Sequence, residues 1–546
     1  MTWAPECAFK WDGAALLILL FAIPLAIAIT SLTVFLYRKS VEKAMRFSAG
    51  RVMSAPVPSS HTAASYTPLR IALVRDAVGP VPSQLAQSRA AMGTVSWIYV
   101  LAGVAHSAIV TVLYLWLSDI DLRPMRTLMV WLPFAWPIIL TLSLTATSTK
   151  RQKYAFIASY FIVLLLMDGA ADIFGLRYQP GFGELFLLWA LNAGLPTVVI
   201  VLLGNRAWRS VGFITLFFSI VLVGGYLLGF QGLGCLVLST RNTTLLSSMN
   251  YLLAGLILLF FAVAWWSFRR LVRHYQAKDY SDQMLMVDSL WLLVTLLEAL
   301  GQMGTSGVAS LTYLLAFAAY KSVSMVGLRQ VRFTQVTEAP RALLMLRVFG
   351  FTSRTRQLTD QVGQYWRYSG PINMIGGTDL ATSLIEPDEL IQFWSRQLRQ
   401  KFIANDADLN SRLQTLDDGR DPDLRYRINE FFCHDNAWQA TVKALARRSA
   451  VVLMDLRGFG KKNRGCEFEL EMLFEEVLVS RVLLLVDRTT EIENLNQVLQ
   501  SAWAKLPESS PNRALTEPVL HLFQVEDRSK ALQPLLSRLF ASAAAA

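Results

Sequence analysis

The sequence VVLMDLRGFGKKNRGCEFELEML occupies residues 451–473. It begins with a short apolar run that ends at Asp455, which is typical of a strand buried inside a parallel sheet. A basic loop with two glycines follows, and then a stretch that opens with Glu467, Glu469 and Glu471. Carboxylates near the positive end of a helix stabilise it. The order strand, polar loop and helix predicts one unit of a layered α/β fold.

The same alternation extends outward from this segment and predicts a flavodoxin-like, doubly wound parallel sheet. After a polar linker at residues 329–341, we expect a cytoplasmic α/β domain at residues 342–546 that folds by itself. Its strands are expected at Leu344–Phe351, Ile372–Ile375, Tyr426–Phe432, Ala450–Asp455, Arg481–Val486 and Val519–Gln524. Its helices are expected near Arg356–Tyr368, Pro387–Ile403, Ala437–Arg447, Glu467–Val479, Glu491–Leu506 and Ser529–Phe540.

Residues 1–328 have a different composition. With 53% hydrophobic and 17% charged residues and a mean hydropathy of +0.39, the chain is too apolar for an ordinary soluble enzyme. Runs of about 20 apolar residues cross a bilayer as helices. We therefore predict an all-α polytopic transmembrane bundle of about nine helices, at Gly13–Tyr37, Val95–Leu117, Leu128–Ala146, Ala155–Phe174, Glu184–Leu203, Val211–Phe230, Tyr251–Phe268, Met284–Leu300 and Val308–Val326.

The positive charges predict the orientation of this bundle. Lys and Arg collect in cytoplasmic loops, and here they concentrate in alternate loops, so that one side of the membrane receives only Lys10, Arg123, Arg126, Arg177 and Arg241. We expect an integral protein of the plasma (inner) membrane with its N-terminus outside and the α/β domain in the cytoplasm. The net charge of +11 is then explained by orientation rather than by nucleic-acid binding. Residues 54–89 are interpreted as a cytoplasmic loop.

Several ionisable residues lie in or beside the predicted spans, where charge is unfavourable. They allow a proton or ion relay on one hand, and structural pairing or interfacial anchoring on the other, and the sequence favours pairing or anchoring. These residues are His106, Asp168, Asp172, Asp288, Glu298 and Lys321. The four cysteines form no CxxC pair, so neither a metal site nor a disulfide framework is predicted.

Ligands of doubly wound sheets bind beyond the carboxyl ends of the strands. The segments to search are 351–354, 376–379 and 455–469, where cations and free helix amides could hold phosphates. One glutamate of the third segment could bind a ribose or stabilise an oxocarbenium-like transition state; alternatively, all three only complement the helix dipole. The nucleotide-binding candidates are Phe351, Thr352, Arg354, Gly376, Gly377, Thr378, Asp455, Arg457 and Arg464.

The strand VVLMD, its loop and the run Gly465-Cys466-Glu467-Phe468-Glu469-Leu470 resemble the strand and Trp-Cys-x-x-Glu-Leu pattern of TIR (Toll/interleukin-1 receptor-like) domains, with Gly465 in place of the Trp. LRVFGFTSRT at 346–355 is similar to the first TIR strand and its loop. GGTDLATSLIEP at 376–387 takes the place of the loop after the second strand, which often mediates self-association in that family. The resemblance implies that Glu469 is the catalytic residue, that NAD is the substrate or ligand with no further cofactor, and that the domain forms homo-oligomers.

The spacing Gly465-Cys466-x-x-Glu469 is also similar to the Gly-Thr-x-x-Glu of nucleoside deoxyribosyltransferases, whose Glu is a nucleophile. Both resemblances imply one carboxylate that acts on a nucleoside-like ligand. The main hypothesis is a membrane-anchored signalling or defence-type protein whose cytoplasmic domain binds, and in the enzymatic interpretation hydrolyses, a nicotinamide nucleotide. Two alternatives stay open: a non-enzymatic membrane receptor or scaffold acting through protein contacts, and a transporter with a regulatory domain.

The charge alternation makes a prediction about topology. Reporter fusions within residues 232–250 should be read outside the membrane, and fusions after Arg329 inside, because both positions follow from the distribution of Lys and Arg. A fusion at Lys461 that reports an outside location would contradict the nine-span count.

Overall fold

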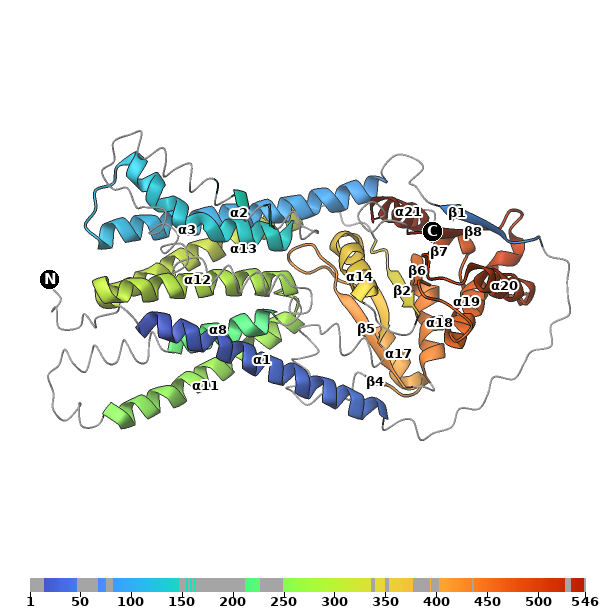
Figure 1. Cartoon of the computed structure of the whole chain (residues 1–546), viewed down its shortest axis with the longest axis horizontal. Coiled ribbons are helices and arrows are strands. Elements are labelled where there is room, and N and C mark those ends of the chain that lie inside the picture. Colours follow the sequence, from blue (N-terminus) through green and yellow to red (C-terminus); the bar gives the residue numbers. More distant parts are fainter. Residues whose placement is uncertain are drawn as a thin grey trace. The chain divides into compact units, whose positions relative to one another are not determined.

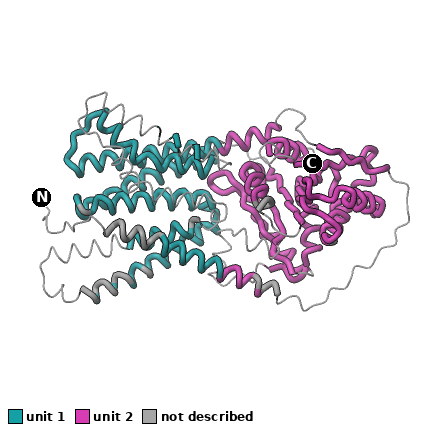
Figure 2. Tube along the Cα trace, viewed as in Figure 1, with its two compact units in different colours: residues 1–35, 93–335, 386–388 teal, residues 36–92, 336–385, 389–546 magenta. Residues whose placement is uncertain are grey.

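The computed structural model describes residues 14–46, 67–74, 82–146, 212–225, 249–334, 339–348, 353–376, 402–434, 437–525 and 532–544, with single residues or pairs near 154–162 and at 393. The chain divides into two compact units (Figure 2). One unit contains residues 1–35 and 93–335 and the other contains residues 36–92, 336–385 and 389–546, with residues 386–388 assigned to the first. Each unit is described below by itself.

The first unit is helical (Figure 1). Its helices include α3 (Pro124–Thr145), α8 (Gly212–Gly225), α11 (Met249–Gln276), α12 (Asp282–Ser306), the 3₁₀ segment η4 (Gly307–Tyr313) and α13 (Leu314–Thr334), together with most of α1 (Ala14–Arg46) and α2 (Ser83–Leu117). Among the described residues, four helical segments are long and apolar enough to cross a membrane: Ser83–Leu117, Pro124–Thr145, Asp282–Met303 and Gly307–Phe333.

These four segments contain the second, eighth and ninth predicted spans and all but the last residue of the third. The first and seventh predicted spans coincide with helices α1 and α11. The sixth coincides with α8, whose apolar stretch Ile214–Gly225 is shorter than a membrane span. The fourth and fifth predictions lie almost entirely outside the described residues. Apolar helices of membrane-spanning length are therefore present, and the count of nine stays a prediction.

The preference for structural pairing of buried charges is confirmed at one position. Asp288 of α12 forms an ion pair with Lys321 of α13, and the Tyr320 hydroxyl donates to the same carboxylate at 3.1 Å. The pair connects two apolar helices through opposite charges, as expected for ionisable groups among membrane helices. Asp168 and Asp172 lie outside the described residues.

In the second unit the described residues form an eight-stranded, all-parallel sheet in the order β1-β8-β7-β6-β2-β3-β5-β4 (Figure 1). All six predicted strands are confirmed. The strands are β1 (Arg70–Val74), β2 (Leu343–Arg347), β3 (Ile372–Gly376), β4 (Phe402–Ile403), β5 (Ile428–Cys433), β6 (Val451–Asp455), β7 (Val482–Val486) and β8 (Val519–Gln524). Two strands, β1 and β4, were not predicted, and the helix expected at Pro387–Ile403 is wrong for its last two residues, which form β4.

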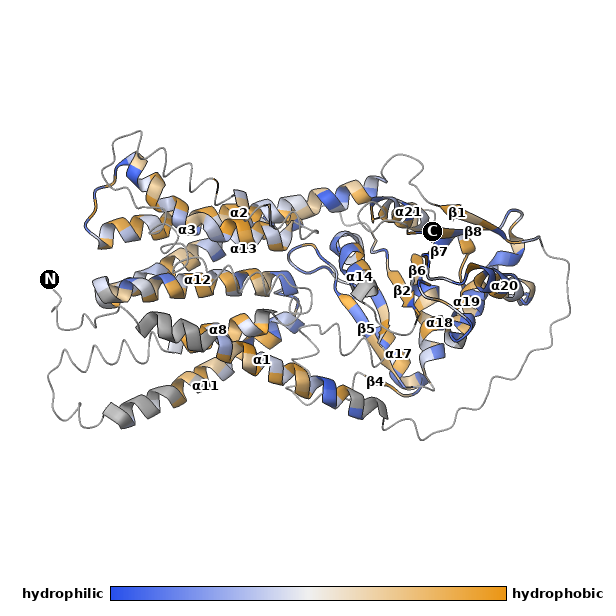
Figure 3. Ribbon diagram, in the orientation of Figure 1, coloured by the Kyte–Doolittle hydropathy of each residue, from blue (hydrophilic) through white to orange (hydrophobic). Residues whose placement is uncertain are grey.

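Helices cover both faces of this sheet. On one face α18 (Trp438–Arg448), α19 (Arg464–Glu476) and α20 (Ile492–Ala504) form a core with Leu344, Val452 and Leu484. On the other face α14 (Ser353–Trp366) and α21 (Leu532–Ala544) form a core with Leu343, Val451 and Leu483. Figure 3 shows the strands largely in hydrophobic colours between more polar helices. Burial on both faces explains why the strands appear in the sequence as continuous apolar runs.

Strand β1 comes from the segment that was interpreted as a loop, so that interpretation is wrong for Arg70–Val74. The strand lies parallel to β8, with Arg70 opposite Val519 and Val74 opposite Phe523. The indole Nε1 of Trp503 donates to the Thr67 carbonyl oxygen at 3.0 Å, and Leu69 is buried in the core. The strand is hard to recognise because it lies at the edge of the sheet and none of its five residues is buried.

The first turns of helix α2 also belong to the α/β unit. The helix begins at Ser83, well before the predicted span at Val95. Leu85 is fully buried against α14 and α21, and the Ser88 and Ser369 hydroxyl groups lie 2.8 Å apart. The α/β unit therefore includes the first turns of α2 and strand β1, in addition to residues 342–546.

The contribution of β1 and the start of α2 to the α/β unit makes a prediction about the isolated domain. A fragment of residues 66–92 joined by a flexible linker to residues 337–546 should unfold at a higher temperature than residues 337–546 alone, because the longer fragment covers the β8 edge and fills the Leu85 site. Burial of one leucine contributes about 1.5–3 kcal/mol. Thermal unfolding followed by circular dichroism measures the difference. Leu85→Ala in the joined fragment should remove part of the gain, and equal midpoints for the two fragments would contradict the prediction.

Candidate functional site

The order of the strands locates the point where ligands bind in sheets of this kind. From β2 the chain passes to β3 on one side and later returns to β6 on the other side, so the connections diverge between β2 and β6. At such a switch point, the segments after the two strands separate and leave room for a ligand at the carboxyl edge. The last residues of the two strands, Arg347 and Asp455, are register partners. The candidate site therefore includes charged residues from both strands.

The loop after β6 is held in one conformation by its own polar groups. Arg457 donates from Nε to Asp455 Oδ1 and from Nη2 to Asp455 Oδ2, both at 2.7 Å, which is a bidentate pair. Gly458 has a φ of 81°, a conformation that side chains rarely adopt. A Cβ atom at Gly460 would lie 2.6 Å from a carboxylate oxygen of Glu491. The positive φ therefore requires glycine at position 458, whereas a side chain at position 460 would have to displace the flexible end of Glu491.

Helix α19 follows the loop and turns Glu469 inward. Cys466, Leu470 and Leu473 of this helix are fully buried in the core, and Glu469 lies three residues after Cys466 and four before Leu473. Positions three and four apart share one helix face. Glu469 is consequently only 5% exposed. Glu471 lies away from the core, where it accepts from Lys505 Nζ at 2.9 Å.

The environment of Glu469 disfavours its charged form. Burial raises the pKa of its carboxyl group from 4.5 to about 8, and the positive charge of Arg347 opposes this shift. Its Oε2 atom has no hydrogen-bond partner among the described residues. A buried polar atom without a partner costs about 1–3 kcal/mol, and such atoms in native proteins often belong to functional sites. Glu469 is thus a buried carboxyl group near Arg347 with one unsatisfied oxygen.

The predicted site residues divide into four groups. The first group comes from β6 and the elements that follow it: Asp455, Arg457 and Glu469. Asp455 and Arg457 form an ion pair with each other. Gly376 ends β3, where a Cβ atom would lie 2.8 Å from the Phe432 ring, so close packing explains this glycine. Arg354 and Arg464 occupy the first turns of α14 and α19, and their side chains are not described. Phe351, Thr352, Gly377 and Thr378 lie outside the described residues.

Arg347 is a site residue that the sequence interpretation missed. It ends the run LLMLR of β2, and an arginine at the end of a buried strand was the available signal. The charge of Asp487, which follows β7, also acts on Arg457. Among the described residues no group of three or more His, Cys, Asp and Glu side chains could hold a metal ion.

Comparisons with protein-family models, with curated proteins and with solved structures found no match to this chain.

Proposed function

We propose that this protein is a membrane-anchored signalling or defence-type protein whose α/β domain binds and hydrolyses a nicotinamide nucleotide, with Glu469 as the catalytic carboxylate. The observation that carries the proposal is the Glu469 carboxyl group, buried and with an unpartnered oxygen, beside the switch point of a doubly wound sheet. The resemblance of residues 465–470 to the TIR pattern supports the choice of ligand.

The chemistry suits a single carboxylate. Cleavage breaks the bond between ribose C1′ and the nicotinamide nitrogen, and the bonding electron pair goes to the ring, which leaves as neutral nicotinamide. Positive charge develops on the ribose, where a carboxylate stabilises it. Water then forms the new C1′–O bond and releases a proton. The positively charged nicotinamide ring of the substrate would favour the ionised form of Glu469, because a nearby opposite charge lowers the pKa of a carboxyl group.

The cations and backbone amides around the start of α19 would bind the phosphate groups of the nucleotide. Lys461 and Lys462 are exposed in the loop, and the helix begins at Arg464. Backbone N–H groups at a helix start attract anions. Arg457 is less suited to this role than the sequence predicted, since Asp455 already neutralises its charge. The nucleotide-binding role of the residues near the neighbouring strand ends stays a prediction; these residues are Phe351, Thr352, Arg354, Gly377 and Thr378.

The membrane arrangement completes the proposal. Nine helices with an outside N-terminus would hold the α/β domain on the cytoplasmic side of the plasma (inner) membrane. The loop at residues 376–387 would mediate contacts between copies of the domain, so that clustering controls activity. The lipid bilayer and other copies of this chain are the expected partners.

The proposed function makes a prediction about turnover of NAD. Full-length protein reconstituted at high density in lipid vesicles should release nicotinamide from NAD at pH about 8, where roughly half of the Glu469 carboxyl groups are ionised. Glu469→Gln should abolish the release, measured by chromatography of the products, because the amide cannot stabilise positive charge. Glu471→Gln is the matched control on the same helix. It removes only the exposed pair with Lys505 and should retain most of the activity.

Two outcomes would contradict the enzymatic proposal. If no nicotinamide is released but Glu469→Gln weakens NAD binding, the site is a nucleotide sensor. If neither turnover nor binding is detected in the clustered protein, a receptor or scaffold acting through protein contacts is the better account.

The second prediction concerns stability and pH. The unfolded chain releases the Glu469 proton near pH 4.5, whereas the folded protein retains it up to a pKa of about 8. The contribution of Glu469 to the free energy of unfolding is therefore at its maximum below pH 4.5. It decreases between pH 4.5 and 8 by up to about 1.4 kcal/mol per pH unit. Glu469→Gln removes this dependence, so its stability relative to wild type should increase with pH. Thermal unfolding at several pH values tests this, and parallel curves for the two proteins would contradict the burial of Glu469.

A further inference from the structure

A pocket of about 580 Å³ lies at the other edge of the sheet, where β2, β6 and β7 begin. Its lining includes Arg341 before β2, Ala450 before β6, Arg481 before β7 and Ala543 in the last turn of α21. Glu469, by contrast, follows the carboxyl end of β6. The pocket is thus separate from the candidate nucleotide site.

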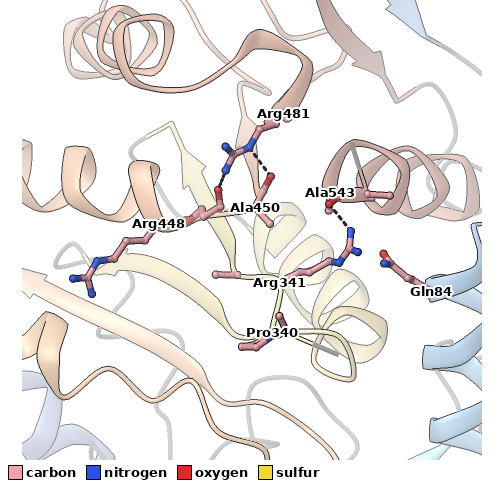
Figure 4. A pocket seen from close by; sticks show the side chains of 11 residues that line it. Gln84, Pro340, Arg341, Arg448, Ala450, Arg481 and Ala543 are labelled. Carbon is pink, nitrogen blue, oxygen red and sulfur yellow. Dashed lines mark hydrogen bonds between the residues drawn. The ribbon is translucent and has the colours of Figure 1, made fainter. Parts of the chain in front are cut away.

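Two arginines are fixed in this pocket by backbone carbonyl groups (Figure 4). Arg481 donates from Nε to the Ala450 oxygen at 2.9 Å and from Nη2 to the Ser449 oxygen. Arg341 donates from Nη1 to the Ala543 oxygen at 2.5 Å. The Gln84 side chain, with its oxygen toward Arg341, accepts from Nη2 at 2.5 Å. A third arginine, Arg448, also lines the pocket, but its guanidinium group points away from the other two in Figure 4.

The charge of these arginines is not balanced within the pocket. Every acceptor named above is a neutral oxygen, and the described residues that line the pocket include no Asp or Glu. Partial burial lowers the pKa of Arg481, which shows that its surroundings disfavour the positive charge. An anionic ligand in the pocket would supply the missing opposite charge.

The size and lining of the pocket indicate which anion fits. Arginine recognises phosphate groups through paired hydrogen bonds. The volume lies within the range of small-molecule sites and exceeds what one inorganic phosphate needs. Ala339, Ala450 and Ala543 provide small apolar walls for a further part of the ligand. Gln84 belongs to α2, whose later residues form a candidate membrane helix.

We propose that this pocket binds a phosphate-bearing anion through Arg341 and Arg481. The phosphate could belong to the headgroup of an anionic phospholipid or to a soluble phosphate compound. Since the site does not include Glu469, this inference is independent of the proposed hydrolysis.

A purely structural role for the arginines predicts different behaviour. As caps of backbone carbonyl groups they need only hydrogen bonds, and a carboxylate introduced nearby would leave the protein unaffected or more stable. As a phosphate site they need an unbalanced positive charge, which the same carboxylate would neutralise. Ala339→Glu makes this distinction without removing either arginine, because Ala339 is exposed on the segment before β2.

The test uses the purified full-length protein in a neutral detergent, with thermal unfolding followed by tryptophan fluorescence. Pyrophosphate represents soluble phosphates, dioctanoyl phosphatidylglycerol represents anionic headgroups, and dioctanoyl phosphatidylcholine is the zwitterionic control. A ligand of the folded state raises the unfolding temperature as its concentration increases. Ala339→Glu and Arg481→Gln should each weaken the apparent affinity about tenfold or more. Arg447→Gln is the matched control, since Arg447 has the same charge but pairs with Glu476.

A rise with phosphatidylglycerol alone would assign the pocket to a lipid headgroup, and a rise with pyrophosphate would assign it to soluble phosphates. The proposal is overturned if neither probe shifts the unfolding temperature. It is equally overturned if Ala339→Glu, correctly folded, binds the probe as tightly as wild type.

Discussion

A parallel sheet with apolar residues on both faces is stable only when helices cover both of them, because each strand alternates its side chains between two cores. In this protein Leu344 and Leu484 face the layer that contains α19, and Leu343 and Leu483 face the layer that contains α14 and α21. The position of every other functional element follows from this constraint. Helix α19 must lie flat on the sheet, and its inward face then directs Glu469 toward the edge where β2 and β6 end.

The same constraint explains why the α/β unit recruits distant sequence. Leu85 fills part of the core between α14 and α21, and strand β1 pairs with β8. Neither segment adjoins residues 342–546 in the chain. Of the sequence between the first two predicted spans, residues 67–74 and the first turns of α2 are therefore part of the folded unit. The first turns of helix α2 consequently add buried contacts to the α/β unit, through Leu85 and Ser88.

The two edges of the sheet differ in how their charges are balanced. At the carboxyl edge, Asp455 and Arg457 neutralise each other in a bidentate pair, and Glu469 keeps an unpartnered oxygen and a raised pKa. At the amino edge, Arg341 and Arg481 bind neutral carbonyl oxygens, so their positive charge stays uncompensated. One edge thus contains a buried carboxyl group with an unpartnered oxygen, and the other contains two arginines with no Asp or Glu among the residues that line their pocket. Both arrangements cost stability in the absence of a ligand.

The sequence by itself determined the class of the two parts and the six central strands, because long apolar runs and short apolar runs differ in length, and length alone separates membrane helices from buried strands. The resemblance to the TIR pattern also pointed to Glu469, whose catalytic role stays a prediction. Only the tertiary structure decided that β1 joins the sheet, because this edge strand has no buried residue and depends on pairing with β8. Only the tertiary structure brought Arg347 opposite Asp455, paired Arg457 with Asp455 and brought Arg341 and Arg481 into one pocket. These relations join residues far apart in the chain or depend on the conformation of one loop, and no periodicity in the sequence encodes them.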